Sequence, residues 1–208
     1  MFKNILMVFF LTVFWLVIPH SLRVPKSASD QKNNVITYYR SLIHSVFVLF
    51  SLLVFPTTYY PGVILVSQSY FIADLLLSTD KILIIHHICS IIGFQGVISY
   101  PIYSEYIITT FLASELTNTI SHTDSLLRFC KHKGFEWFSV FCYILIRVIL
   151  GGYYNYTKII KSLDMTLECS VLAVIYNIIY FGSVYHSIIT IKTLSKQNTI
   201  KAKTKTKH

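Results

Sequence analysis

The chain is divided into seven apolar stretches by short polar segments, and this pattern restricts its fold more than any other feature. A helix needs about 20 mostly apolar residues to cross the roughly 30 Å of hydrocarbon in a bilayer. The composition agrees, because 54% of the residues are hydrophobic and only 13% are charged. The stretches are Ile5–Ile18, Tyr38–Phe55, Gly62–Leu77, Ile82–Ile98, Tyr106–Ile120, Phe135–Leu150 and Cys169–Ile191. Backbone groups in lipid must pair within the chain, so we predict an all-α integral membrane protein with about seven transmembrane helices, within a range of six to eight.

Basic residues gather on one side of these predicted spans. That side receives Arg23, Lys26, Lys32, Arg40, Lys81, Arg128, Lys131, Lys133 and the six lysines from Lys192 onward. The opposite side receives only Lys3, Lys158 and Lys161. Because basic residues accumulate in cytosolic loops, we predict a lumenal N-terminus and a cytosolic C-terminus.

The spans define three regions of the chain. Residues 1–37 are predicted to form a first transmembrane helix and a basic cytosolic loop, and residues 38–194 the main helical domain. No A-x-A-like site follows the first helix, which favours an uncleaved helix over the alternative of a signal peptide. Residues 195–208 are expected to be a disordered basic tail, attracted to anionic lipid headgroups by about 1 kcal/mol per lysine. Asn155 begins a glycosylation sequon in a loop predicted to be lumenal.

Five ionisable side chains of the predicted spans are candidates for interior sites. They are Asp74, His86, His87, Glu115 and Arg147. A charge in hydrocarbon costs at least about 2.5 kcal/mol, so each of them marks an interior site. At 1.5 Å per residue, Asp74 and His86 each lie about 6 Å from the turn that joins their helices. Glu115 lies about 8 Å from the end of its own predicted helix, on the same side of the membrane as that turn. We therefore expect Asp74, one of the two histidines and Glu115 to share one layer.

Polar residues at helical spacing extend this layer. Tyr70 lies four residues before Asp74, and Asn118 lies three residues after Glu115. Arg147 is expected toward the opposite side of the membrane, too far away for an ion pair with Glu115. Asn177 is a further polar residue predicted to line the interior. Adjacent helical residues point about 100° apart, so one histidine is expected to line the interior while the other contacts a neighbouring helix.

Two roles remain open for the histidine pair. The histidines either hold helices together by hydrogen bonds or act as a general base beside a carboxylate. A metal site is not expected, because the other histidines, His44 among them, stand alone in the sequence. The four cysteines are expected to be packing residues. The sequence contains no nucleotide-binding loop or protease signature, and no nucleic-acid partner is expected.

Six segments together resemble one membrane-protein family. They are "YYRSLIHSVFVLF", "SYFIADLLL", "KILIIHHICSIIGF", "LASELTNTIS", "YILIRVILGGYY" and "IYNIIYFGSVYHSI". In this order they resemble the TLC domain family, which includes the translocating-chain-associated proteins, the longevity-assurance ceramide synthases and ceroid-lipofuscinosis type relatives. The resemblance covers residues 38–194. It implies a helical barrel with an internal lipid-holding cavity, usually in the endoplasmic reticulum.

The resemblance also implies candidate chemistry. In the synthases a histidine pair is required for N-acyl transfer from acyl-CoA to a sphingoid base, which carries over to His86 and His87. Synthases follow this pair with a denser acidic segment, whereas "SELTNTISHTDSLLRFCKHK" has Glu115 in the helix and Asp124 expected beyond its end. The chain is therefore closer to the non-synthase relatives.

Three functions follow from this resemblance. The first is lipid handling that senses or shapes acyl-chain or sphingolipid composition, with membrane lipids as partners. The second is N-acyl transfer, with no resident cofactor but with acyl-CoA as co-substrate, a histidine as base or acyl carrier, and Asp74 or Glu115 orienting it. The third is an accessory role in trafficking or translocation. The expected location is the endoplasmic reticulum, or a host membrane if the chain is viral.

Overall fold

The protein is helical throughout the part of the chain that the computed structural model describes. That part comprises residues 2–17, 32–55, 57–78, 81–99, 104–130, 132, 135–160 and 167–205, and it contains no strand. The helices are α1 (Phe2–Val17), α2 (Lys32–Val54), α3 (Tyr60–Leu77), α4 (Lys81–Ser99), α5 (Ser104–Phe129), α6 (Glu136–Tyr143), α7 (Gly151–Tyr154) and α8 (Leu167–Lys205). A short 3-10 helix, Thr57–Tyr59, precedes α3. The all-α prediction is confirmed.

Two π-helical segments lengthen the sixth helix. Ile144–Leu150 joins α6 to α7, and Asn155–Ile160 continues α7. The resulting rod runs past Leu150, where the sequence analysis ended this span. Asn155 therefore lies within a helix, and its predicted place in a loop is wrong.

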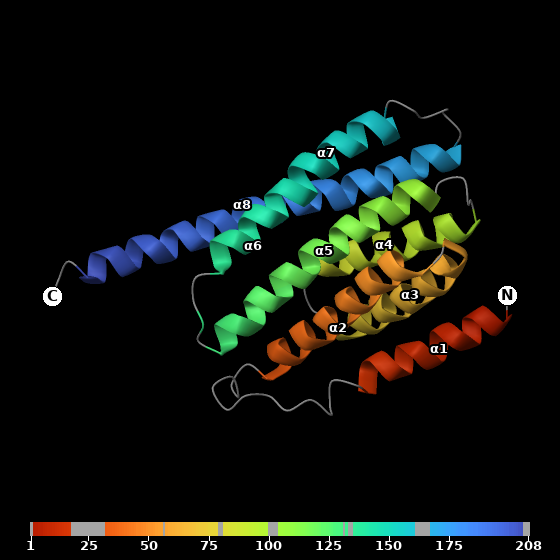
Figure 1. Ribbon diagram of the computed structural model, residues 1–208, viewed down its shortest axis with the longest axis horizontal. Helices are drawn as coiled ribbons and strands as arrows, with labels where there is room; N and C mark the ends of the chain where they lie inside the picture. Colours follow the sequence, from red (N-terminus) through yellow and green to blue (C-terminus); the bar gives the residue numbers. More distant parts are fainter. Residues whose placement is uncertain are drawn as a thin grey trace.

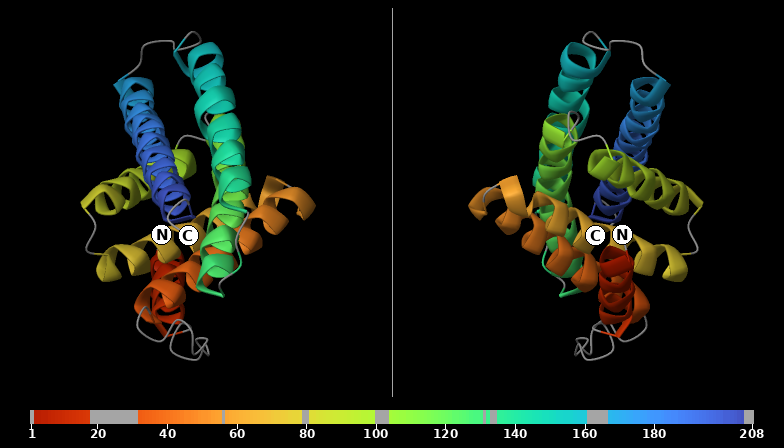
Figure 2. Two further views of the ribbon diagram at one scale, coloured as in Figure 1. Left: turned by 90° about the vertical axis from the view of Figure 1, so that its left-hand side faces the viewer. Right: turned by 90° about the vertical axis from the view of Figure 1, so that its right-hand side faces the viewer.

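The helices run back and forth along the bundle. α1 begins and α8 ends at opposite ends of the molecule (Figure 1). α2 packs against α3 and α5, and α3 also contacts α1 and α4. α8 and the helix formed by α6 and α7 lie at one side of the bundle, and α1 lies at the other (Figures 1 and 2). The described part of the chain thus forms seven helical rods, the number that the apolar pattern predicts.

Four helices are long and apolar enough to cross a membrane. They contain Val35–Val54, Tyr60–Leu77, Glu136–Thr157 and Ala173–Lys196. Two further apolar helices, Asn4–Val17 and Lys81–Gly96, are shorter. α5 is not among these six, and serine, threonine and charged residues recur along its length.

Several helix ends differ from the predicted ones. α5 continues past Ile120 to Phe129, so Asp124 lies inside the helix and pairs with Arg128 at 3.2 Å. Burial raises the pKa of Asp124, and the nearby Arg128 cation opposes that shift. α8 extends to Lys205, so most of the basic tail is helical, and the predicted disorder is wrong there. The expected region boundaries at 37/38 and 194/195 both fall inside helices.

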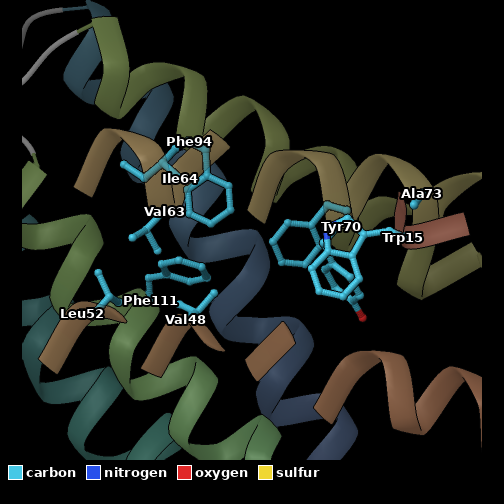
Figure 3. Packing of buried hydrophobic residues seen from close by; sticks show 10 residues of the cluster. Trp15, Val48, Leu52, Val63, Ile64, Tyr70, Ala73, Phe94 and Phe111 are labelled. Atoms are coloured by element: carbon cyan, nitrogen blue, oxygen red, sulfur yellow. The ribbon is translucent and has the colours of Figure 1, made fainter. Parts of the chain in front are cut away.

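An apolar cluster joins the first five helices. Phe94 of α4 and Phe111 of α5 pack edge to face, with ring centroids 4.6 Å apart, and Phe71 of α3 stacks on Phe94. Figure 3 shows most of the cluster members, from Trp15 of α1 to Phe111. This packing fixes α3 between α1, α2 and α4, which positions the polar groups described below.

Charged side chains lie inside the bundle, and many large apolar side chains lie on its surface. Arg40, His44 and Glu115 are each only 1% exposed, although arginine and glutamate are rarely buried fully unless paired. Large apolar side chains face outward on most helices, including Phe9, Phe50, Phe141 and Phe181. Apolar residues outside and charged residues inside are the arrangement that a bilayer favours.

Candidate functional site

Three helices bring charged side chains together around Asp74. Its Oδ1 accepts a hydrogen bond from Nη2 of Arg40, which α2 contributes. Its Oδ2 lies 3.4 Å from Nε2 of His87, which α4 contributes. All three side chains are buried. We call Arg40, Asp74 and His87 the Asp74 cluster.

The contact with Asp74 assigns the tautomer of His87. A carboxylate oxygen only accepts hydrogen bonds, so Nε2 of His87 carries the hydrogen. Nδ1 then presents a lone pair, and this buried atom has no hydrogen-bond partner among the described residues. An imidazole held by a carboxylate at one nitrogen and free at the other is the arrangement of a general base.

The two adjacent histidines have different surroundings. His87 is buried and faces Asp74, whereas His86 is half-buried. The ring of His86 lies edge-on to Phe71, with centroids 6.3 Å apart, and 5.6 Å from the ring of His87. The prediction that only one histidine lines the interior agrees with this geometry, and the structure identifies it as His87.

Tyr70 connects the Asp74 cluster to a second polar group. Its Oη lies 2.7 Å from Oγ of Ser41, and the Arg40 guanidinium lies 6.0 Å from its ring centroid. The ring of His44 stacks on Tyr70 with centroids 4.0 Å apart and planes 11° apart. Tyr70 therefore contacts both Arg40 and His44, which belong to the same helix.

Glu115 pairs with His44 and not with the adjacent histidines of α4. Its Oε2 lies 3.8 Å from Nδ1 of His44. Ser45 and Asn118 also hydrogen-bond to Glu115, with Nδ2 of Asn118 donating to Oε2 at 3.4 Å. Asp74 therefore pairs with a histidine of α4, and Glu115 pairs with a histidine of α2.

Sequence reasoning missed His44 and Arg40 as interior residues. His44 was expected to stand alone, and Arg40 was counted with the basic residues outside the membrane. Both residues lie in "YYRSLIHS", four positions apart, which places them on one helix face. The spacing Arg-x-x-x-His, which places both side chains on one helix face, was the signal that could have revealed them.

Arg147 lies beside the helix of Glu115, and its predicted position toward the opposite side is wrong. The guanidinium donates to Oγ1 of Thr117 at 2.6 Å, to Oδ1 of Asn118 at 2.7 Å and to the carbonyl of Ser114 at 2.9 Å. It also donates to Oη of Tyr143 at 3.2 Å. Asn118 thereby bridges Arg147 and Glu115. Arg147 lies in the π-helical segment Ile144–Leu150, and such segments are frequent at functional sites.

Asn155 and Asn177 form a separate polar contact. Nδ2 of Asn155 donates to Oδ1 of Asn177 at 3.0 Å, which joins the sixth rod to α8. Asn155 is 4% exposed. A glycosylated asparagine must be accessible, so this geometry does not favour modification of the folded chain.

Among the described residues no group of three or more histidine, cysteine or acidic side chains could hold a metal ion. No family model matches the chain, and no curated protein and no solved structure is similar enough to count as a match.

Proposed function

We propose that the chain is a multi-pass membrane protein of the TLC type, which handles lipid at the Asp74 cluster and senses or shapes acyl-chain or sphingolipid composition. The observation that carries this proposal is the buried Arg40–Asp74–His87 contact inside an apolar-surfaced bundle. Buried ion pairs stabilise a protein little compared with apolar residues of the same size. A cluster of this kind is therefore better explained by ligand handling than by folding.

The cluster is suited to the polar end of a lipid. Nδ1 of His87 offers an acceptor, and Nε of Arg40 is a buried donor without a hydrogen-bond partner among the described residues. A lipid headgroup that carries hydroxyl or amine groups can use both atoms. The acyl chains would lie against apolar helix surfaces. We further propose an endoplasmic reticulum location with a cytosolic C-terminus, which the excess of basic residues on one side supports.

Lipid that copurifies with the protein provides the test. The full chain and the variants His87→Gln, Asp74→Asn and His86→Gln are purified in mild detergent, and bound lipids are identified by mass spectrometry. His87→Gln and Asp74→Asn should lose a lipid class that the wild type retains. His86→Gln is the matched control, because the ring of His86 lies against Phe71 and does not contact Asp74. Equal lipid content in all four proteins would contradict the proposal.

N-acyl transfer is the second candidate, and the free Nδ1 of His87 favours it. In this reaction Nδ1 accepts a proton from the amine of a sphingoid base as the nitrogen attacks the thioester carbonyl of acyl-CoA. The C–S bond then breaks, and the thiolate takes the proton from the imidazolium. Arg40 and Asp74 would hold His87 in place through these steps.

The acyl-transfer reaction is tested separately in cells that lack ceramide synthase. They receive the chain, a labelled sphingoid base and acyl-CoA of several lengths. Product formation that is lost in His87→Gln but retained in His86→Gln would establish catalysis. If no acyl length yields product while lipid still copurifies, lipid handling without catalysis remains the proposed function.

A further inference from the structure

Glu115 and His44 form a second acid–histidine pair, which the lipid proposal does not use. Oε2 of Glu115 and Nδ1 of His44 lie 3.8 Å apart, and each side chain is 1% exposed. The pair joins α2 to α5. The His44 ring stacks on Tyr70, which also contacts Arg40 of the Asp74 cluster.

Hydrogen bonds around Ser67 assign the tautomer of His44. Oγ of Ser67 lies 3.0 Å from the carbonyl oxygen of Val63, which can only accept. The single hydroxyl hydrogen of Ser67 is therefore donated to Val63. Nε2 of His44 lies 3.1 Å from the same Oγ, so Nε2 must donate its hydrogen there. In a neutral imidazole this leaves Nδ1 with a lone pair, and Nδ1 is the atom that faces Glu115.

Two acceptor atoms thus face each other in a buried space. An ionised Glu115 would present lone pairs to the lone pair of Nδ1, and the other groups that hydrogen-bond to it, Ser45 and Asn118, carry no charge. A buried charge without a contacting cation is costly. The Asp74 cluster is different, because both oxygens of Asp74 face donors. We infer that Glu115 and His44 bind one proton between Oε2 and Nδ1. The proton belongs either to the carboxyl group or to the imidazolium, and in both cases the pair is electrically neutral.

Residues from several helices influence which atom holds this proton. Arg147 of the sixth rod reaches Glu115 through Asn118, and its positive charge favours the carboxylate. His122 of α5 and His87 of α4 act electrostatically on His44, and α1 contributes the uncharged Trp15. Arg40 and His44 share α2, so the helix that contributes to the proton site also contacts Asp74 of α3.

Infrared and nitrogen NMR spectra of the full chain in lipid nanodiscs test this site. A protonated carboxyl group has a carbonyl stretch that a carboxylate lacks. At neutral pH this band should vanish in Glu115→Gln and persist in the control Asp74→Asn. If Glu115→Gln does not fold, glutamate-specific ¹³C labelling of a variant in which the other three glutamates are glutamines assigns the band instead. Nitrogen shifts of ¹⁵N-labelled histidine, assigned with His44→Gln, report whether His44 carries two protons.

The protonation states of Glu115 and His44 decide the test. A protonated Glu115 or a doubly protonated His44 supports the proton site, whichever atom holds the hydrogen. A carboxylate at Glu115 together with a neutral His44 would overturn it. The inference does not rest on a lipid ligand, so its result is independent of the copurification experiment.

Discussion

Arg40 and His44 lie one helical turn apart on α2, and each contacts a different buried acid. Arg40 binds Asp74 of α3, and His44 faces Glu115 of α5. Residues four positions apart on a helix share a face, so a single stripe of α2 serves both acids. Substitutions in α2 should therefore disturb the interior more than substitutions in any other helix.

Replacing Arg40 with methionine should destabilise the protein by about 3–5 kcal/mol. The cost arises because Asp74 keeps a buried charge that His87 alone contacts. The measurement is unfolding in mixed micelles with a rising fraction of denaturing detergent. In the double variant Arg40→Met/Asp74→Asn the charge is gone, and the loss should be smaller than in Arg40→Met. Additive losses from the two changes would argue against a direct interaction.

Asp74 and the histidine pair could be located from the sequence because their helices meet at a short turn. Counting residues from that turn predicts one depth for Asp74 and the histidine pair, and in the structure Asp74 contacts His87. Arg40 was missed because α2 begins at Lys32, before the apolar stretch that starts at Tyr38, which places Arg40 inside the bundle. The apolar pattern alone does not reveal a helix start that lies in polar sequence.

The predicted depth of Arg147 was wrong for a related reason. Its predicted span ended at Leu150, but the rod continues through two π-helical segments to Ile160. Arg147 therefore lies near the middle of the rod and meets the polar face of α5. π-helical segments depend on tertiary contacts, such as the bond from Oη of Tyr180 to the carbonyl of Val148, which no local pattern encodes.

Substituting lysine for Arg147 should destabilise the protein by about 1–3 kcal/mol. Arginine reaches the carbonyl of Ser114 and the side chains of Thr117 and Asn118 at once, and a lysine ammonium cannot reproduce this fork. Arg128→Lys is the matched control, because the Arg128 side chain is 48% exposed, and its change should stay within about 0.5 kcal/mol. Equal effects of both substitutions would show that the buried hydrogen bonds contribute little.

Gly152→Ala should destabilise the contact between α7 and α8 by about 1–3 kcal/mol. An added Cβ would lie 2.6 Å from Oη of Tyr180, so that ring must move and its bond to Val148 is lost. Gly182→Ala is the control, because no heavy atom lies within 4 Å of its added Cβ, and helix propensity should stabilise it by up to about 1 kcal/mol. Tyr180→Phe in the Gly152→Ala background should recover part of the loss. If Gly152→Ala does not change the stability, α7 and α8 can move apart here to accommodate the added methyl group.

Cys130 gives a direct test of the orientation that the basic residues predict. It follows α5 and is exposed, whereas Cys89 is buried within α4. In sealed microsomes whose cytosolic face is outward, a membrane-impermeant maleimide should modify a variant that retains Cys130 as its only cysteine. A variant that retains only Cys89 should stay unmodified before and after the membrane is permeabilised. Modification of Cys130 only after permeabilisation would invert the topology, and the Asp74 cluster would then lie toward the lumen, out of reach of acyl-CoA in the cytosol.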